Sequence, residues 1–347
     1  MVKLFKSNSI IFIIVILSIF IISTAGQTSS TRQVTDMLGR EVEIPSEINR
    51  IATSYTPATL FVVALGAQDK LVAAGKGMPK QQIFNELAPE IEDLPEISGG
   101  SGINLESVAA LDPDLIIISP HGGAAAEADR LESIGYPTVI INPEGFYQVA
   151  ETFEFLGKTL NLEEKAAEIS GLYQEIEEIT AKTRELSDSE KKRVYFANSQ
   201  LLDTVGANML QSDLIKIAGG INPAEEVKSG FIEASSEQLI EWDPDLVILS
   251  QFYRGELADL YDSPGYQGIA AFKSNNLKRI PSNIEPWDFP GPASGLISVW
   301  LAEKLYPEHY SELDLLKFTD KFYNKIYGQT FSELTENYNE RSGEGGS

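Results

Sequence analysis

The chain has 347 residues, of which 43% are hydrophobic and 22% charged, enough for two globular domains of ordinary size. Its 27 Lys and Arg against 51 Asp and Glu give a net charge of −24, which argues against binding to nucleic acid or to an anionic membrane surface. Cysteine is absent, which excludes disulfides, a thiolate nucleophile and cysteine-ligated zinc.

The first 25 residues predict an export signal. Lys3 and Lys6 precede an apolar run over residues 10–22, and the small residues Ser23 and Ala25 follow, so cleavage after Ala25 is expected. The run is shorter than the roughly 20 residues of a spanning helix, and an uncleaved anchor is the alternative. No cysteine follows it, which excludes lipid attachment of the bacterial type there. We expect the mature protein outside the cytoplasmic membrane, either periplasmic or at the cell surface.

After a polar linker at 26–33, residues 34–161 predict an N-terminal α/β lobe. Alternating apolar residues around Leu38-Gly39-Arg40 indicate a hairpin. Strands and helices then alternate, which is typical of a parallel sheet covered by helices. The expected strands are 50–55, 70–75, 115–119 and 137–142, and the expected helices are 56–67, 106–112 and 124–135.

Residues 162–186 predict one long helix between two lobes. Its 25 residues would span roughly 37 Å, more than a local crossover needs. The strand and helix pattern then restarts over 187–335, which predicts a C-terminal α/β lobe, and residues 336–347 are expected to be a disordered tail. The expected strands there are 193–198, 245–250 and 277–282, and the expected helices are 209–220, 235–242, 294–307 and 314–328.

One sequence pattern occurs twice in the chain. Residues 104–119 (NLESVAALDPDLIIIS) and 235–250 (SSEQLIEWDPDLVILS) align without a gap, each as a helix, Asp-Pro-Asp and a buried strand. We interpret Asp-Pro-Asp as a turn, because proline cannot continue the helix and aspartate favours turns. The repeat therefore indicates two equivalent lobes.

No catalytic constellation is found in the sequence. The two histidines, His121 and His309, fall in different lobes, and there is no paired-histidine zinc motif, phosphate-binding glycine loop or nucleophile elbow. We therefore expect no enzyme activity and no bound cofactor or metal of the protein's own.

Candidate ligand-binding residues follow the carboxyl ends of the predicted strands, where open α/β sheets bind ligands. Aromatic rings and two cations in these loops suit a bulky, anionic and partly apolar ligand. For each residue, packing beneath a loop is the alternative. The ten candidates are Tyr55, Lys76, Met78, His121, Tyr147, Phe252, Tyr253, Arg254, Trp287 and Asp288.

Three segments together resemble the solute-binding proteins of ATP-binding-cassette (ABC) importers for ferric siderophores, haem and cobalamin. They are TDMLGREVEIPSEINRI at 35–51, NLESVAALDPDLIII at 104–118 and the region from AFKSNNLKRIP to LAEKLYPE at 271–308. The resemblance covers roughly residues 34–330. It implies two Rossmann-like lobes joined by one rigid helix, with ligand in the cleft between them and little closure. With one histidine per lobe, a chelated metal is expected rather than a naked ion.

The resemblance also implies a membrane partner. Glu106 and Glu237 occupy matching places in the two repeats, each at the second position of a helix capped by Asn104 or Ser235. Matching glutamates in the family dock on the two subunits of the permease. A purely local role at the helix start is the alternative.

We therefore expect a monomer that delivers a chelated metal, foremost a ferric siderophore, to a permease dimer. Haem or cobalamin is the alternative ligand, and an extracytoplasmic ligand sensor is the alternative class of protein.

Overall fold

The structure is a computed structural model that describes residues 30–75, 82–99, 102–228 and 230–342. It opens with an antiparallel hairpin of β1 (Thr31–Thr35) and β2 (Glu41–Pro45). The turn places Gly39 at φ +81°, a conformation that glycine adopts without strain. The predicted hairpin is confirmed.

The N-terminal lobe is built on a parallel sheet with the strand order β4-β3-β7-β8. Alternate side chains of its strands enter two separate hydrophobic clusters, so both faces of the sheet are covered. Helices α1 and α5 supply the cluster on one face, and α3 and α4 supply the other. The strands are β3 (Ile51–Thr53), β4 (Leu71–Ala73), β7 (Leu115–Ile118) and β8 (Thr138–Ile140); the helices are α1 (Thr56–Ala64), α3 (Leu105–Leu111), α4 (Ala124–Glu132) and α5 (Phe146–Leu160).

The C-terminal lobe repeats this plan with a parallel sheet of order β13-β12-β9. Its strands also feed two clusters, with α7 on one face and α8 and α10 on the other. The elements are β9 (Val194–Ala197), β12 (Leu246–Leu249), β13 (Leu277–Arg279), α7 (Leu210–Ile217), α8 (Ser236–Trp242) and α10 (Ala270–Lys273). The predicted α/β class with parallel sheets is confirmed.

The duplicated Asp-Pro-Asp performs the same two tasks in each lobe. The first aspartate ends its helix in the left-handed region, Asp112 at φ 44° and Asp243 at φ 39°. The second accepts a hydrogen bond from the backbone amide just before the neighbouring strand. These bonds join Arg50 N to Asp114 at 2.9 Å and Arg193 N to Asp245 at 2.8 Å. The predicted turn role is confirmed, and the aspartates also fix where each strand begins.

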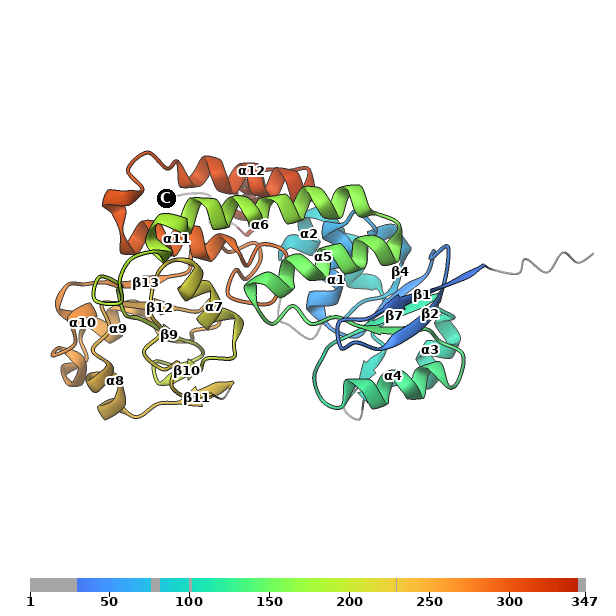
Figure 1. Cartoon of the computed structure of the whole chain (residues 1–347), viewed down its shortest axis with the longest axis horizontal. Coiled ribbons are helices and arrows are strands. Elements are labelled where there is room, and N and C mark those ends of the chain that lie inside the picture. Colours follow the sequence, from blue (N-terminus) through green and yellow to red (C-terminus); the bar gives the residue numbers. More distant parts are fainter. Residues whose placement is uncertain (1–29, 76–81, 100–101, 229, 343–347) are drawn as a thin grey trace, which may run out of the picture.

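A single helix, α6 (Glu163–Arg184), connects the lobes where residues 162–186 predicted one. It packs against α5 of the N-terminal lobe and against α7 and α11 (Leu296–Leu305) of the C-terminal lobe. Figure 1 shows it running along one side of the molecule with α12 (Leu315–Tyr327) beside it.

The C-terminal helices return to the N-terminal lobe. Helix α12 packs against α1 and α6, and α13 (Phe331–Ser342) packs against α2 (Gln82–Leu87). The disordered tail predicted from residue 336 is therefore wrong as far as residue 342, because the segment continues α13. Residues 343–347 lie outside the described residues.

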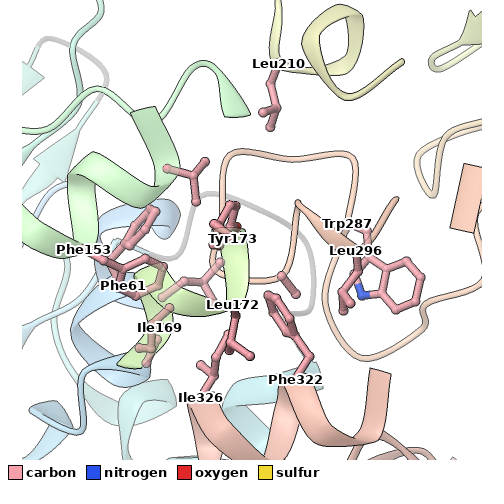
Figure 2. Close-up of a cluster of buried hydrophobic side chains, with 14 of the residues drawn as sticks. Phe61, Phe153, Ile169, Leu172, Tyr173, Leu210, Trp287, Leu296, Phe322 and Ile326 are labelled. Carbon is pink, nitrogen blue, oxygen red and sulfur yellow. The ribbon is translucent and has the colours of Figure 1, made fainter. Parts of the chain in front are cut away.

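One hydrophobic cluster extends through both lobes. Figure 2 shows Phe61 and Phe153 of the N-terminal lobe, Tyr173 of α6, Leu210 of the C-terminal lobe and Phe322 of α12 in this cluster. The lobes therefore share a core at their junction.

The remaining elements are short and lie mostly in the connections. They are β5 (Ser98–Gly99), β6 (Gly102–Ile103), β10 (Asp203–Val205), β11 (Phe231–Glu233), α9 (Leu257–Tyr261), and the 3-10 turns η1 (Gln68–Lys70), η2 (Pro89–Asp93), η3 (Pro264–Tyr266) and η4 (Pro307–His309). Within the described ranges, no helix combines the length and hydrophobicity needed to cross a bilayer. The predicted export signal at 1–25 lies outside these ranges.

Candidate functional site

Two predicted ligand residues, Tyr55 and His121, lie with Glu144 at the carboxyl edge of the N-terminal sheet. Tyr55 follows β3, His121 follows β7 and Glu144 follows β8. The exposed imidazole of His121 lies 3.0 Å from a carboxylate oxygen of Glu144. Burial, and then the charge of Glu144, raise the pKa of the Tyr55 phenol well above its usual value. Lys76 and Met78, predicted at the same edge, lie outside the described residues.

The side chain of Tyr147 points toward helix α6. It lies in the first turn of α5, and its hydroxyl donates a 2.8 Å hydrogen bond to Glu177 of α6. This contact raises the pKa of the phenol. The side chain is therefore engaged at the α5–α6 contact rather than beside His121. Sequence analysis missed α5, although Phe146, Val149, Phe153, Leu156 and Leu160 recur at helical spacing.

On the C-terminal lobe, an aromatic and cationic group follows β12. The rings of Phe252 and Phe289 lie 6.3 Å apart, edge to face. The Arg279 guanidinium lies 5.7 Å from the Tyr253 ring and donates to backbone oxygens of the same loop. Arg254 is exposed, its backbone amide is bound to Ser199, and its guanidinium has no partner in the part of the chain that the structure describes.

The ring of Trp287 lies in the protein interior, whereas the sequence predicts it at the ligand site. Its indole is 2% exposed, donates a 2.9 Å hydrogen bond to the Tyr323 hydroxyl and packs against Phe331. The surrounding prolines indicated a stiff loop, but not the direction of the ring. These contacts support the alternative interpretation, a core contact, and ligand binding by Trp287 stays a prediction.

Asp288 is also buried, at 2% exposure, and neither of its carboxylate oxygens has a hydrogen-bond partner among the described residues. Burial raises its pKa to about 6. The Ser250 hydroxyl and the backbone amides of Gln251 and Asp288 itself lie close enough to favour the charged form, but none of them reaches the carboxylate with hydrogen-bond geometry. Gln211 of α7 donates to the backbone oxygen of Asp288 at 2.7 Å. Gln211 is not among the predicted site residues, because it lies in the first turn of α7 rather than directly after a predicted strand.

Glu106 and Glu237 are both exposed at the second position of their helices. The Asn104 side chain accepts from the Glu106 amide, and Ser235 forms a capping box with Gln238. Within the described ranges, neither carboxylate has a side-chain hydrogen-bond or ion-pair partner. The predicted caps are confirmed, and docking remains a prediction.

The described residues contain no group of three or more His, Asp or Glu arranged to hold a metal ion. The residues after the strands of the C-terminal sheet include the exposed cation Arg254, the rings of Phe252 and Phe289, and the buried carboxylate of Asp288. These groups suit recognition of a small molecule rather than bond breaking.

Comparison with known proteins gives a consistent result. The profile of the periplasmic binding protein family matches residues 51–284. The molybdate-binding protein MolA of Haemophilus influenzae is 28% identical over 327 residues, which covers 86% of this chain and 92% of MolA. A vitamin B12-binding protein of Vibrio parahaemolyticus is 26% identical over 59% of this chain and 71% of its own length. A periplasmic solute-binding protein of Veillonella parvula superposes with a TM-score of 0.77 at 26% identity, over 88% of this chain and 96% of that one.

Proposed function

Since this chain belongs to the periplasmic binding protein family, we propose that it captures a chelated metal, foremost a ferric siderophore, between its two lobes. Its general role is that of a solute-binding protein of an ABC importer, and its relatives are not enzymes. Family membership indicates a periplasmic location.

The observation that carries the choice of ligand is the exposed Arg254, which directly follows Phe252 and Tyr253 and whose guanidinium has no partner among the described residues. A guanidinium forms strong charge-assisted hydrogen bonds to anionic oxygens. Phe252 and Phe289, 6.3 Å apart, offer apolar surface for the organic part of a chelate. A ferric catecholate or hydroxamate combines both features, namely anionic or polarised oxygens and apolar linkers.

Two other ligands are favoured by the relatives. Similarity to MolA over 86% of the chain favours a metal oxyanion such as molybdate. Similarity to vitamin B12-binding proteins over a shorter region favours cobalamin, and haem is the remaining alternative of the same class.

Isothermal titration of the mature protein against a ferric catecholate, a ferric trihydroxamate, haemin, cobalamin and molybdate would distinguish these ligands. We expect a ferric siderophore to bind with a submicromolar Kd and molybdate to bind more weakly. Tight binding of molybdate alone would contradict chelate capture and support the oxyanion.

For delivery, we propose that the exposed carboxylates of Glu106 and Glu237 contact one permease subunit each. Both project from equivalent helix starts, so two equivalent arginine-bearing permease subunits could pair with both. We propose that the protein does this as a monomer, exported by its N-terminal signal.

A further inference from the structure

Buried oxygen acceptors without partners gather at the carboxyl edge of the C-terminal sheet. Among the described residues, no donor reaches either carboxylate oxygen of Asp288 or the side-chain oxygens of Gln211 and Gln251 with hydrogen-bond geometry. The Ser250 hydroxyl and the backbone amides of Gln251 and Asp288 lie near the Asp288 carboxylate without that geometry. Asp288 is 2% exposed and Gln211 6% exposed, so bulk water does not replace the missing donors. Leaving one such acceptor unsatisfied costs free energy, and here several occur together.

Gln211 and Gln251 both bind the backbone of the segment that carries Asp288. The Gln211 amide nitrogen donates to the backbone oxygen of Asp288 at 2.7 Å, and the Gln251 amide nitrogen donates to the backbone oxygen of Ser282 in the same loop. Each amide group is therefore oriented by its nitrogen, which leaves its oxygen without a partner. Gln251 follows β12 directly, and Asp288 lies in the segment after β13. Adjacent parallel strands end at the same edge, where open α/β sheets bind ligands.

The loop that carries Asp288 reaches the N-terminal lobe. The backbone oxygen of Ile284 accepts a 3.0 Å hydrogen bond from Ile83 of α2, and Gly291 lies against Leu60 of α1. The acceptors therefore lie on the part of the C-terminal lobe that adjoins the other lobe.

We propose that Asp288, Gln211 and Gln251 form an acceptor subsite that binds N–H or O–H groups of the captured solute. The assignment rests on the proposed function and narrows its ligand class. A chelate with amide N–H groups can donate to all three side chains. Molybdate at neutral pH presents only acceptor oxygens, which a carboxylate repels. The subsite therefore selects donor-bearing chelates against bare oxyanions. Because the acceptors are covered in the free protein, binding requires neighbouring side chains to move, and association should be slower than the diffusion limit.

The first test needs no ligand. We would measure denaturant unfolding at pH 8 for wild type, Asp288→Asn and the control Asp36→Asn. Asp36 is also buried, at 4% exposure, but its carboxylate accepts hydrogen bonds of 3.0 and 2.9 Å from the backbone amides of Leu38 and Arg40. Removing an unpartnered buried charge should lower the unfolding equilibrium constant about fivefold or more in Asp288→Asn, whereas Asp36→Asn should raise it. A destabilised Asp288→Asn would show that Asp288 has a structural donor and would overturn the subsite.

The second test compares ligands. Isothermal titration with a ferric trihydroxamate bearing peptide N–H groups, a ferric catecholamide and molybdate would be run on wild type, Asp288→Asn and Gln251→Met. We expect both variants to weaken chelate binding about tenfold or more and to leave molybdate binding unweakened. Chelate binding at the wild-type Kd in both variants would overturn the subsite while leaving the proposed function intact. If wild type binds neither chelate, chelate capture itself fails, and the unfolding measurement alone then decides whether the acceptors are unpartnered.

Discussion

Glu285 is an acidic residue held where water and cations do not reach it. It is 2% exposed, and its two carboxylate oxygens accept hydrogen bonds of 3.1 and 3.0 Å from the Tyr327 hydroxyl of α12. Burial raises the pKa of Glu285 to about 7, against the opposing effect of the hydroxyl donors. Folding therefore takes up a proton at this position between about pH 4.5 and 7.

Stability should consequently fall as pH rises. The folded pKa of about 7 lies above the ordinary value of 4.5, so the folded state binds more protons between these limits. The stabilisation is fully present below about pH 4.5 and is lost as pH rises through about 7, a change of about 3 kcal/mol. Asp288, with its raised pKa, acts in the same direction at slightly lower pH. Denaturant unfolding between pH 4.5 and 8.5 would measure the slope.

Two variants isolate the contribution of Glu285. Glu285→Gln should flatten the profile, leaving mainly the part due to Asp288. Tyr327→Phe removes a donor that favours the charged form, so it should extend the fall in stability to higher pH. An unchanged profile in Glu285→Gln would assign the pH dependence to other groups.

Arg254 is the residue whose removal should affect binding most selectively. The side chain is exposed and its guanidinium has no partner within the described ranges, so Arg254→Ala should not disturb the fold. Loss of one charge-assisted contact should weaken binding of a ferric siderophore by about 1–3 kcal/mol. The control Lys273→Ala removes the same charge from an exposed position on α10 and should leave the Kd unchanged. Equal effects of both variants would indicate a general charge effect instead.

At the scale of the elements, the contact between α6 and α7 depends on one glycine. Gly219, just after α7, has φ +86°, and a Cβ there would lie 2.5 Å from the backbone oxygen of Thr183 in α6. Gly66, just after α1, has φ +76° with nothing within 4 Å. Both glycines have a left-handed backbone, but only at Gly219 would an added Cβ also clash with a neighbouring atom.

The two glycines therefore form a matched pair. Gly66→Ala should cost about 1–2 kcal/mol, the penalty of the left-handed region for a residue with a Cβ. Gly219→Ala adds a clash with backbone that cannot rotate away and should cost about 2–5 kcal/mol. Thermal unfolding of both variants would measure the difference, and equal losses would show that α6 and α7 can separate without penalty.

Features set by local sequence were predictable, and features set by packing across the chain were not. The hairpin at Gly39, the turns at Asp112 and Asp243 and helix α6 depend on turn chemistry and periodicity. Whether the Trp287 ring points outward depends on Tyr323 and Phe331, which are distant in sequence.

Helix α5 is predictable in principle, since its apolar spacing is regular, but the loop assignment of Tyr147 takes no account of that spacing. The acceptors around Asp288 could not have been predicted, because an oxygen without a donor is recognised only when every neighbour is known.

At the scale of the whole molecule, docking should depend on the two glutamates together. Glu106→Lys combined with Glu237→Lys reverses one exposed charge on each lobe, and neither residue is among the candidate ligand residues. We expect unchanged affinity for the solute and loss of transport and of stable association with the permease, because each arginine contact becomes repulsive. Uptake would be followed in cells that carry the permease and the ATPase.

The control for docking reverses the same number of charges elsewhere. Glu154→Lys with Glu241→Lys changes two exposed glutamates, one in each lobe, and Glu241 lies on the same helix as Glu237. This control should transport normally. If the Glu106 and Glu237 double variant transports normally, those glutamates have only a local role at the helix start.

The core shared by the two lobes has a consequence for how the protein denatures. Because one apolar cluster includes Phe61, Tyr173, Leu246 and Phe322, neither lobe can lose its side-chain packing without exposing the other's. In scanning calorimetry we expect a single endotherm with equal calorimetric and van't Hoff enthalpies, as for one cooperative unit. For the same reason, chains cut within α6 and expressed as separate halves should each remain molten, and should regain a sharp transition only when mixed.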